Sequence, residues 1–174
     1  MVLKRNINVV VIKVKENNQL LGYIDGEVDF ISNGAGSDIS FNTPFLIGKD
    51  YRSGTGIPLH GSVDNLSIWD VAKSQEEIQG NMFSELSGYE QNLVGYWNFN
   101  DGEGTALTDL SGNGNDGEVN EAALTTDRHG KTKSAYKFAK GTGFIEANMA
   151  SQLEGNSPFS ISLWVKFNAL EQDS

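Results

Sequence analysis

The chain has 174 residues, with 13 Lys and Arg against 23 Asp and Glu, so its formal net charge is −10 at pH 7. Such an acidic balance excludes nucleic acid as the main partner, because phosphate binding requires clustered basic side chains. The absence of cysteine excludes a thiol nucleophile, a CxxC redox pair and a thiolate zinc site. A hydrophobic fraction of 38% suffices for one packed core, so we expect a single domain over residues 1–174.

The first fifteen residues do not form a signal peptide, because Lys4, Arg5, Lys13 and Lys15 interrupt the apolar run. No stretch of the sequence approaches the roughly 20 apolar residues of a membrane-spanning helix. We therefore expect no membrane insertion, and we expect either a soluble protein or a piece of a larger one whose export signal lies outside these residues.

Apolar and polar residues alternate with a period of two along most of the chain, which predicts β-strands. The first expected strands are residues 8–15, 19–24 and 27–31, and Asp25-Gly26 favours a two-residue hairpin turn between the last two. Further strands are expected at 38–41, 45–48, 61–69, 93–100, 135–138, 143–147 and 159–167. Many short strands at this spacing predict an all-β fold, an antiparallel β-sandwich of the jelly-roll kind.

One short helix is expected at about residues 74–86. Ser74 and Glu77 have the spacing of a capping box, and Ile78, Met82 and Leu86 follow at i, i+4 and i+8. We expect this helix to place its single apolar stripe on the rim of the sandwich.

Two stretches resemble a known family. The first is Gly61-Ser-Val-Asp-Asn-Leu-Ser-Ile-Trp-Asp70 with the helix cap that follows it. The second is Leu93-Val-Gly-Tyr-Trp-Asn-Phe-Asn-Asp-Gly-Glu-Gly104 with the loop Asp109-Leu-Ser-Gly-Asn-Gly-Asn-Asp-Gly117. Together they resemble the laminin-G-like, concanavalin A-like jelly-roll domains of exported bacterial proteins. The resemblance implies an extracellular or cell-surface location.

The matching pieces stand in an unusual order. Residues 1–88 resemble the C-terminal half of the family domain, and residues 89–174 resemble its N-terminal half. Either the two halves close on one another as a circular permutant, or the chain spans the junction of two tandem domains. We expect one sandwich, because the strand at 93–100 follows the strand at 61–69 after a single helix and can pair with it locally.

Three alternating acids, Asp25, Glu27 and Asp29, superficially suggest a glycoside hydrolase of the laminarinase type. Such an enzyme requires two carboxyl groups about 5–5.5 Å apart when it retains configuration. At a hairpin turn Asp25 faces solvent and is out of register with the other two acids, which favours solvated acids over a catalytic pair. The histidines His60 and His129 are expected in loops. We therefore expect no enzyme, and the hydrolase remains an alternative.

A loop rich in oxygen ligands follows the strand at 93–100. Asp109, Ser111 and Asn113 have the one-three-five spacing of a calcium-binding loop, with Gly114 at the sixth position. The twelfth position is Asn120, not a bidentate Glu, and no helices flank the loop, so it is not an EF-hand. The alternative is an Asx-type turn in which the side chains bond their own backbone.

The family resemblance implies a calcium ion on the sandwich. Asp101 and Asp64 are then the further candidate ligands, because each lies at the edge of a strand in a matched motif. Such a calcium ion would be structural and would fix a long loop in place.

Aromatic residues lie on both faces of the expected strands. Trp97 and Phe99 share a face that we expect in the core, with Tyr96 on the opposite face. In the strand at 159–167, Ile161, Leu163, Val165 and Phe167 point to one side. Ser162, Trp164 and Lys166 point to the other side, where the indole could stack on a sugar ring. The alternative is that the helix or a loop covers Trp164, and the same alternatives hold for Trp69.

The function that these observations favour is a non-catalytic carbohydrate-binding or adhesion module of a secreted or cell-surface protein. Its expected ligand residues are Trp164, Ser162 and Lys166, and its partner would be a glycan or an extracellular protein. A laminarinase-type glycoside hydrolase and a structural spacer repeat are the rival hypotheses. The sequence does not specify the oligomeric state.

Overall fold

The computed structural model describes residues 5–14, 18–33, 44–50, 57–139, 143–149, 153 and 157–168, with the backbone alone at residues 50, 57 and 58. The strand expected at 38–41 lies outside the described residues. Among the described residues, no helix has the length and apolar character needed to cross a membrane.

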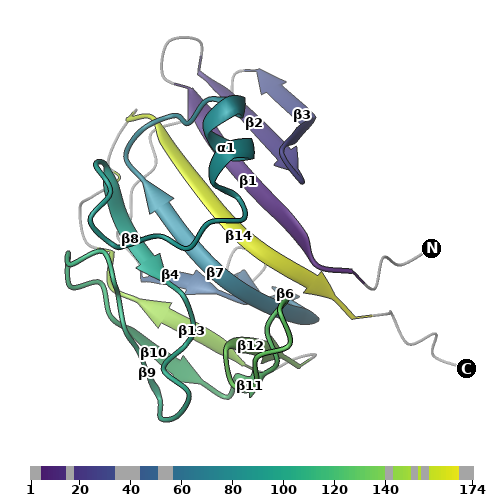
Figure 1. The fold of residues 1–174 in the computed structure, drawn as a ribbon, viewed down its shortest axis with the longest axis vertical. Helices are drawn as coiled ribbons and strands as arrows, with labels where there is room; N and C mark the ends of the chain where they lie inside the picture. Colours follow the sequence, from purple (N-terminus) through teal and green to yellow (C-terminus); the bar gives the residue numbers. More distant parts are fainter. Residues whose placement is uncertain are drawn as a thin grey trace, which may run out of the picture.

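The described strands form two main sheets, in which every pair is antiparallel. The large sheet runs β11 (Ala123–Thr125), β12 (Ala135–Phe138), β7 (Gly61–Trp69), β14 (Phe159–Phe167), β1 (Ile7–Val14), β2 (Gln19–Ile24) and β3 (Glu27–Asn33), and β8 (Leu93–Trp97) also pairs with β7. The small sheet runs β4 (Phe45–Ile47), β13 (Phe144–Ala147), β10 (Gly117–Asn120) and β9 (Ala106–Leu107). A separate ladder joins β5 (Lys49–Asp50) to β6 (Ile57–Pro58). The predicted all-β, antiparallel fold is therefore confirmed (Figure 1).

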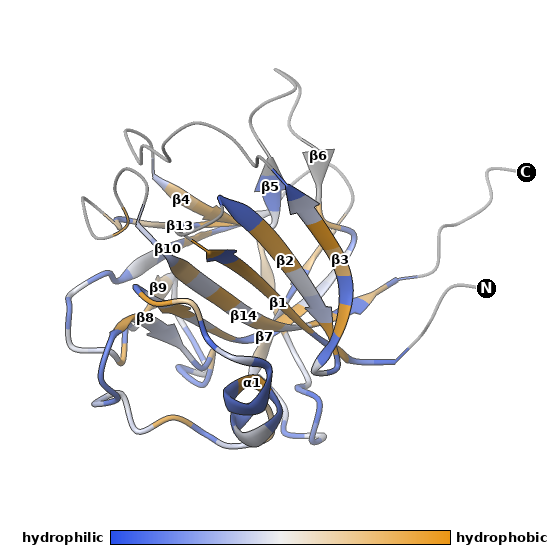
Figure 2. Ribbon diagram, turned by 90° about the horizontal axis from the view of Figure 1, so that it is seen from above, coloured by the Kyte–Doolittle hydropathy of each residue, from blue (hydrophilic) through white to orange (hydrophobic). Residues whose placement is uncertain are grey.

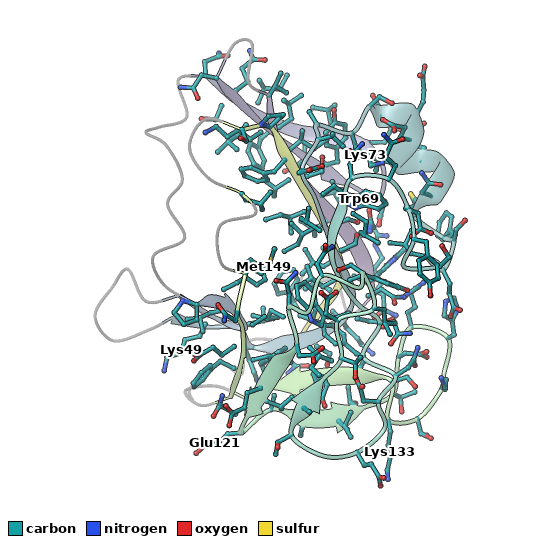
Figure 3. All side chains as sticks on the ribbon, turned by 90° about the vertical axis from the view of Figure 1, so that its left-hand side faces the viewer. Lys49, Trp69, Lys73, Glu121, Lys133 and Met149 are labelled. Carbon is teal, nitrogen blue, oxygen red and sulfur yellow. The ribbon has the colours of Figure 1, made fainter. Side chains whose placement is uncertain are left out.

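The main hydrophobic core lies between the two sheets. Trp97, Phe99, Phe138 and Ile145 are completely buried there. Figure 3 shows side chains filling this space, with Met149 among them. The expected core positions of Trp97 and Phe99 are confirmed, and the burial of apolar area in this core stabilises the sandwich.

Strands from both halves of the sequence share the large sheet. β14 lies between β7 and β1, so Ser162 is the register partner of Ser67 on one side and of Val10 on the other. Two strands from the first half of the chain therefore flank a strand from the second half. The permuted order remains a prediction, and this interleaving is the arrangement that one closed sandwich requires.

A bulge in β7 keeps its alternation in phase with the two faces of the sheet. The register between β7 and β14 shifts between Ser162 and Trp164, and Asn65 has the left-handed φ of 48°. This extra residue lets Leu66 follow Val63 into the core while Ser67 reaches the outer face. The outer face of β7 thereby collects the polar and aromatic side chains discussed below.

The turn between β2 and β3 has the predicted form. Asp25 and Gly26 have φ of 50° and 80°, as a two-residue turn with both central residues left-handed requires. The Asp25 carboxylate accepts the backbone N–H of Asn8 at 2.9 Å and pairs with Arg5. Asp25 therefore holds the turn against β1, and the expectation that it simply faces solvent is wrong.

The helix α1 (Gln75–Asn81) begins as the sequence predicts. Ser74 Oγ accepts the N–H of Glu77 at 3.3 Å, and a carboxylate oxygen of Glu77 accepts the N–H of Ser74 at 2.8 Å. The helix ends at Asn81 and not near residue 86, because Leu86 packs elsewhere, against the cluster of Trp69, Leu93 and Tyr96.

The helix α1 lies on the outer face of the large sheet and not on the rim. Figure 2 shows it on the side of β1, β14 and β7 opposite to β4, β13 and β10. Its buried residue, Ile78, packs with Val10, Ile12 and Tyr23. The side chain of Gln79 also donates to the carbonyl of Gly26 at 3.0 Å. The molecule therefore has three layers, with the helix as the outermost one.

Candidate functional site

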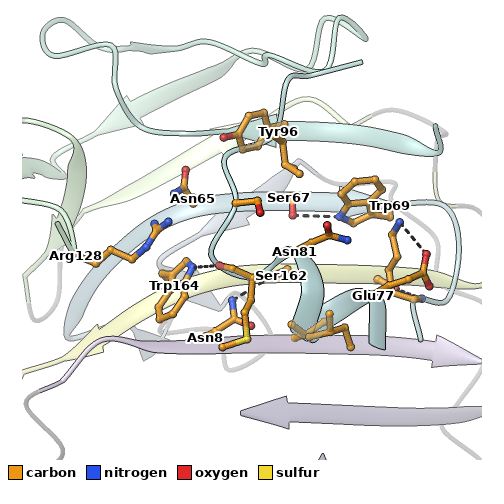
Figure 4. A pocket seen from close by; sticks show the side chains of 17 residues that line it. Asn8, Asn65, Ser67, Trp69, Glu77, Asn81, Tyr96, Arg128, Ser162 and Trp164 are labelled. Carbon is orange, nitrogen blue, oxygen red and sulfur yellow. Dashed lines mark hydrogen bonds and ion pairs between the residues drawn. The ribbon is translucent and has the colours of Figure 1, made fainter. Parts of the chain in front are cut away.

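A pocket lies between α1 and the outer face of the large sheet (Figure 4). Its volume is about 610 Å³, open space at the mouth included. Its floor is formed by Asn8, Ser67 and Ser162, and indoles stand at its two ends, Trp164 at one and Trp69 at the other. We call this the α1 pocket.

The floor of the α1 pocket carries two hydroxyl groups side by side. Ser67 and Ser162 are register partners across β7 and β14 and point to the same face. Ser67 Oγ accepts the indole N–H of Trp69 at 3.2 Å, and Ser162 Oγ accepts the amide of Asn8 at 3.4 Å. Within the described residues neither hydroxyl donates to an acceptor, so each retains a proton for a ligand.

The indole of Trp164 is covered. Its side chain packs against Phe83, with ring centroids 5.8 Å apart, and the Arg128 guanidinium carbon lies 4.9 Å from the ring centroid. Its N–H donates to the carbonyl of Met82 at 3.2 Å, just beyond the end of α1. Trp164 is only 9% exposed, so the alternative in which a loop covers it describes the structure, and an open stacking platform is wrong.

The indole of Trp69 is occupied in a similar way. The Lys73 ammonium lies 3.9 Å from its ring centroid, and this lysine also lies 3.5 Å from the carboxylate of Glu77. Tyr96 packs against Trp69 in the same cluster. Both ends of the pocket are therefore indoles with a cation over them, and the polar floor between them is the surface that remains for recognition.

Arg128 reaches the pocket from the loop between β11 and β12. Its Nη1 lies 2.8 Å from the carboxylate of Asp64, and the two side chains are 6% and 9% exposed. Burial raises the pKa of Asp64, and the attraction of Arg128 opposes that rise. With its amide oxygen turned toward Arg128, Asn65 accepts from the same guanidinium. These contacts fix the guanidinium over Trp164.

A comparison with protein families matches one segment of the chain. Residues 7–79 fit the laminin-G family model of the concanavalin A-like lectin/glucanases superfamily. This segment is laminin-G-like. It contains β1, β2, β3, β7 and the first residues of α1, and it therefore supplies most of the pocket floor. Neither a curated protein nor a solved structure matches the chain significantly.

The structure separates the three predicted ligand residues. Ser162 and Trp164 line the α1 pocket together, beside the floor that the laminin-G-like segment provides. Lys166 is exposed and lines a smaller depression with Asp64 and Arg128, on the other side of Trp164. Lys166 therefore belongs to a different surface from Ser162.

The predicted calcium loop is occupied by its own hydrogen bonds. Asp109 is buried, and its carboxylate accepts the N–H groups of Tyr96, Ser111 and Asn115 and the hydroxyl of Ser111, all at 2.9–3.0 Å. The amide of Asn113 donates to the carbonyl of Leu93 at 3.1 Å. All the acceptor sites of Asp109 are thus filled by donors, as in the Asx-type alternative, and this set of residues does not fit a cation.

The other two predicted metal ligands lie apart from this loop's hydrogen-bond network. Asp101 accepts the hydroxyl of Thr108 at 2.6 Å, and Asp64 pairs with Arg128. Among the described residues, no group of three or more His, Cys, Asp and Glu side chains is placed to hold a metal ion.

Two acids of the first hairpin accept hydrogen bonds that hold the fold together. A carboxylate oxygen of Glu27 accepts the amide of Gln79 at 3.0 Å, so Glu27 helps to attach α1. Asp25 bonds the backbone of Asn8. Among the described residues that line the α1 pocket, Glu77 is the one acid.

Sequence reasoning missed Asn8 and Arg128. The sequence did contain a signal for Asn8. It is the one amide in the run Ile7–Ile12, in which every other residue is β-branched and apolar on both faces of the strand. The sequence contained no signal for Arg128. Its loop is remote in sequence from β7 and β14, and only the tertiary fold brings it to Trp164.

Proposed function

We propose that this chain is a non-catalytic carbohydrate-binding module and that the α1 pocket holds the glycan. The observation that carries the proposal is the pair of adjacent hydroxyls, Ser67 and Ser162, on the floor of a concave, aromatic-walled pocket. Sugars combine apolar C–H surface with many hydroxyls, and this pocket combines apolar walls with hydroxyl and amide groups. The laminin-G-like segment is compatible with the proposal, because its superfamily includes lectins, and with the rival hydrolase, because the same superfamily includes glucanases.

The concave shape of the pocket between α1 and the sheet supports a small ligand. The helix α1 closes one side of the pocket, and Ile78 and Met82 from it and its C-cap give an apolar wall opposite the serines. We propose a short saccharide or the end of a longer chain as the occupant.

The charges around the pocket favour binding over hydrolysis. Hydrolysis requires two carboxyl groups that flank the scissile bond, whereas the described lining includes the single acid Glu77. Glu77 caps α1, and its hydrogen bonds with Ser74 hold its pKa below the usual value for a glutamate. A low pKa is the opposite of what a general acid needs. We include an extracellular or cell-surface location in the proposal, and the support for it is the family resemblance alone.

A glycan array followed by calorimetric titration tests the proposal. Wild type should bind a defined set of saccharides, and Ser162→Ala should bind the same saccharides about tenfold more weakly, since it removes one hydrogen bond. Ser32→Ala, on the exposed strand β3, is the matched control and should bind as wild type does.

Each rival function gives a different result. Release of reducing ends from laminarin by the purified protein would favour the hydrolase. Failure of wild type to bind any saccharide on the array would favour the structural spacer.

A further inference from the structure

Two buried polar atoms at the α1 pocket have no hydrogen-bond partner among the described residues. They are Asn8 Oδ1 and Arg128 Nε. Asn8 is 1% exposed, and the Arg128 side chain is 6% exposed. An unpaired buried polar atom is unfavourable, so such atoms are generally paired with protein, ordered water or a ligand. Both residues line the α1 pocket, and each of the two atoms itself exposes less than 1 Å².

The orientation of the Asn8 amide follows from its neighbours. Its Nδ2 lies 3.4 Å from the carbonyl oxygen of Leu163 and 3.4 Å from Ser162 Oγ. A carbonyl can only accept, so the nitrogen must face Leu163 and the oxygen must face away from it. Asn8 Oδ1 therefore offers an acceptor, and a ligand hydroxyl is a group that can satisfy it.

Arg128 offers the complementary group, an unpaired donor, at the same indole. Its Nη1 is engaged by Asp64, which leaves Nε–H as an unpaired donor. The guanidinium covers the ring of Trp164, and Trp164 is the register partner of Asn8 across β14 and β1. An unpaired acceptor and an unpaired donor thus flank the same indole.

The charges that surround this end of the pocket are already balanced. Arg128 pairs with Asp64, and Lys73 at the far end pairs with Glu77. No charge in the described lining is left over for a carboxylate, sulfate or amino group. A neutral ligand therefore fits better than a charged one.

We infer that Asn8 and Arg128 select a neutral sugar that presents a vicinal diol, with one hydroxyl donating to Asn8 Oδ1 and the adjacent oxygen accepting from Arg128 Nε. This inference rests on the proposed carbohydrate-binding function and specifies its ligand. Asn8 and Arg128 become the specificity residues, and the covered indole of Trp164 holds Arg128 in place beside the ligand.

Isothermal titration with methyl glycosides of glucose, galactose and mannose, with their monodeoxy analogues and with glucuronic acid tests this. For the glycoside that binds, loss of either hydroxyl of one adjacent pair should weaken binding about tenfold or more, since each loss leaves a buried group unpaired. Loss of the remaining hydroxyls should have a smaller effect. Glucuronic acid should bind no better than its neutral counterpart.

Variants of the two residues separate recognition from folding. Asn8→Val removes a buried, unpaired acceptor together with the two hydrogen bonds of 3.4 Å from Nδ2, so these effects on stability oppose one another and the melting temperature should change little, while binding weakens about tenfold. Arg128→Lys removes Nε and keeps a positive charge beside Asp64, and it should abolish the preference for the intact diol. Asn120→Val, in strand β10 of the small sheet, is the matched control and should bind as wild type does.

The outcomes distinguish this inference from the proposed function. If wild type binds a glycoside and Asn8→Val binds it equally well, the inference is overturned while carbohydrate binding stands. Tighter binding of glucuronic acid than of glucose would overturn it too. If wild type binds none of the saccharides, the proposed function fails and the inference falls with it.

Discussion

Asp64 and Arg128 form an ion pair of 2.8 Å in which both side chains are more than nine-tenths buried. The pair joins β7 to the loop between β11 and β12 at the end of the α1 pocket. Because burial raises the pKa of Asp64 while Arg128 lowers it, the cation is what makes an ionised Asp64 tolerable inside the fold.

Arg128→Met should therefore destabilise the protein by about 3–5 kcal/mol at pH 7, because it leaves a buried carboxylate without its counter-charge. The variant raises the folded-state pKa of Asp64 further above the ordinary value. A raised pKa contributes stability that is present below the unfolded value of 3.8 and is lost as the pH rises through the folded value. The deficit of the variant should thus shrink on acidification, as measured by denaturant unfolding between pH 4 and pH 8.

The exposed Lys137 on β12 provides the control for that experiment. Lys137→Met removes an equal charge from a solvated position and should change stability by less than about 0.5 kcal/mol. A deficit of Arg128→Met that is the same at every pH would contradict the assignment to Asp64.

The left-handed backbone at Asn65 gives a second prediction. Asn65→Gly and Asn65→Ala both lose the amide that accepts from Arg128. The difference between their free energies of unfolding therefore reports the cost of the left-handed backbone alone. The glycine variant should be the more stable by about 1 kcal/mol, because φ of 48° is strained for alanine. At Asn33 on β3, which has no positive φ, the order should reverse. Equal stabilities at Asn65 would mean that the bulge relaxes on substitution.

The sequence predicted more of the fold than of the candidate site. Period-two alternation identified β7 and β14, and the pair Asp25-Gly26 identified a turn, because these signals are local. The predicted end of α1 near residue 86 was wrong. Leu86 packs with the cluster that contains Trp69 and does not extend the apolar stripe of the helix. Local signals cannot anticipate such a competition.

The α1 pocket depends on contacts between residues far apart in sequence. Asn8 and Ser162 are 154 positions apart, and Arg128 comes from a loop 64 positions from Asp64. The sequence placed Ser162 and Trp164 on one face correctly, since alternation fixes that. It could not determine that Phe83 and Arg128 would cover the indole, because this depends on how α1 and a distant loop pack.

The loop held by Asp109 gives a third prediction. Asp109→Ala removes a buried carboxylate that bonds Tyr96, Ser111 and Asn115, so it should destabilise the protein by about 3 kcal/mol or more. Asp101→Ala, which breaks one exposed bond to Thr108, should cost less than about 1 kcal/mol. Thermal unfolding of wild type in millimolar calcium should match that in EDTA. A rise in melting temperature with calcium would contradict this prediction and support the calcium site expected from the sequence.

The central position of β14 gives the last prediction. β14 pairs with β7 and β1, both from the first half of the chain, so neither half can complete the large sheet alone. If the two halves form one unit, the amides of Ile161 and Leu163 should exchange only through global unfolding, with the same free energy as the buried amides of β1 and β7. Tryptophan fluorescence and far-ultraviolet circular dichroism should then report a single transition, since Trp69 lies in one half and Trp97 and Trp164 lie in the other. Two separate transitions, or β14 amides that exchange well before those of β7, would instead favour a junction between tandem domains.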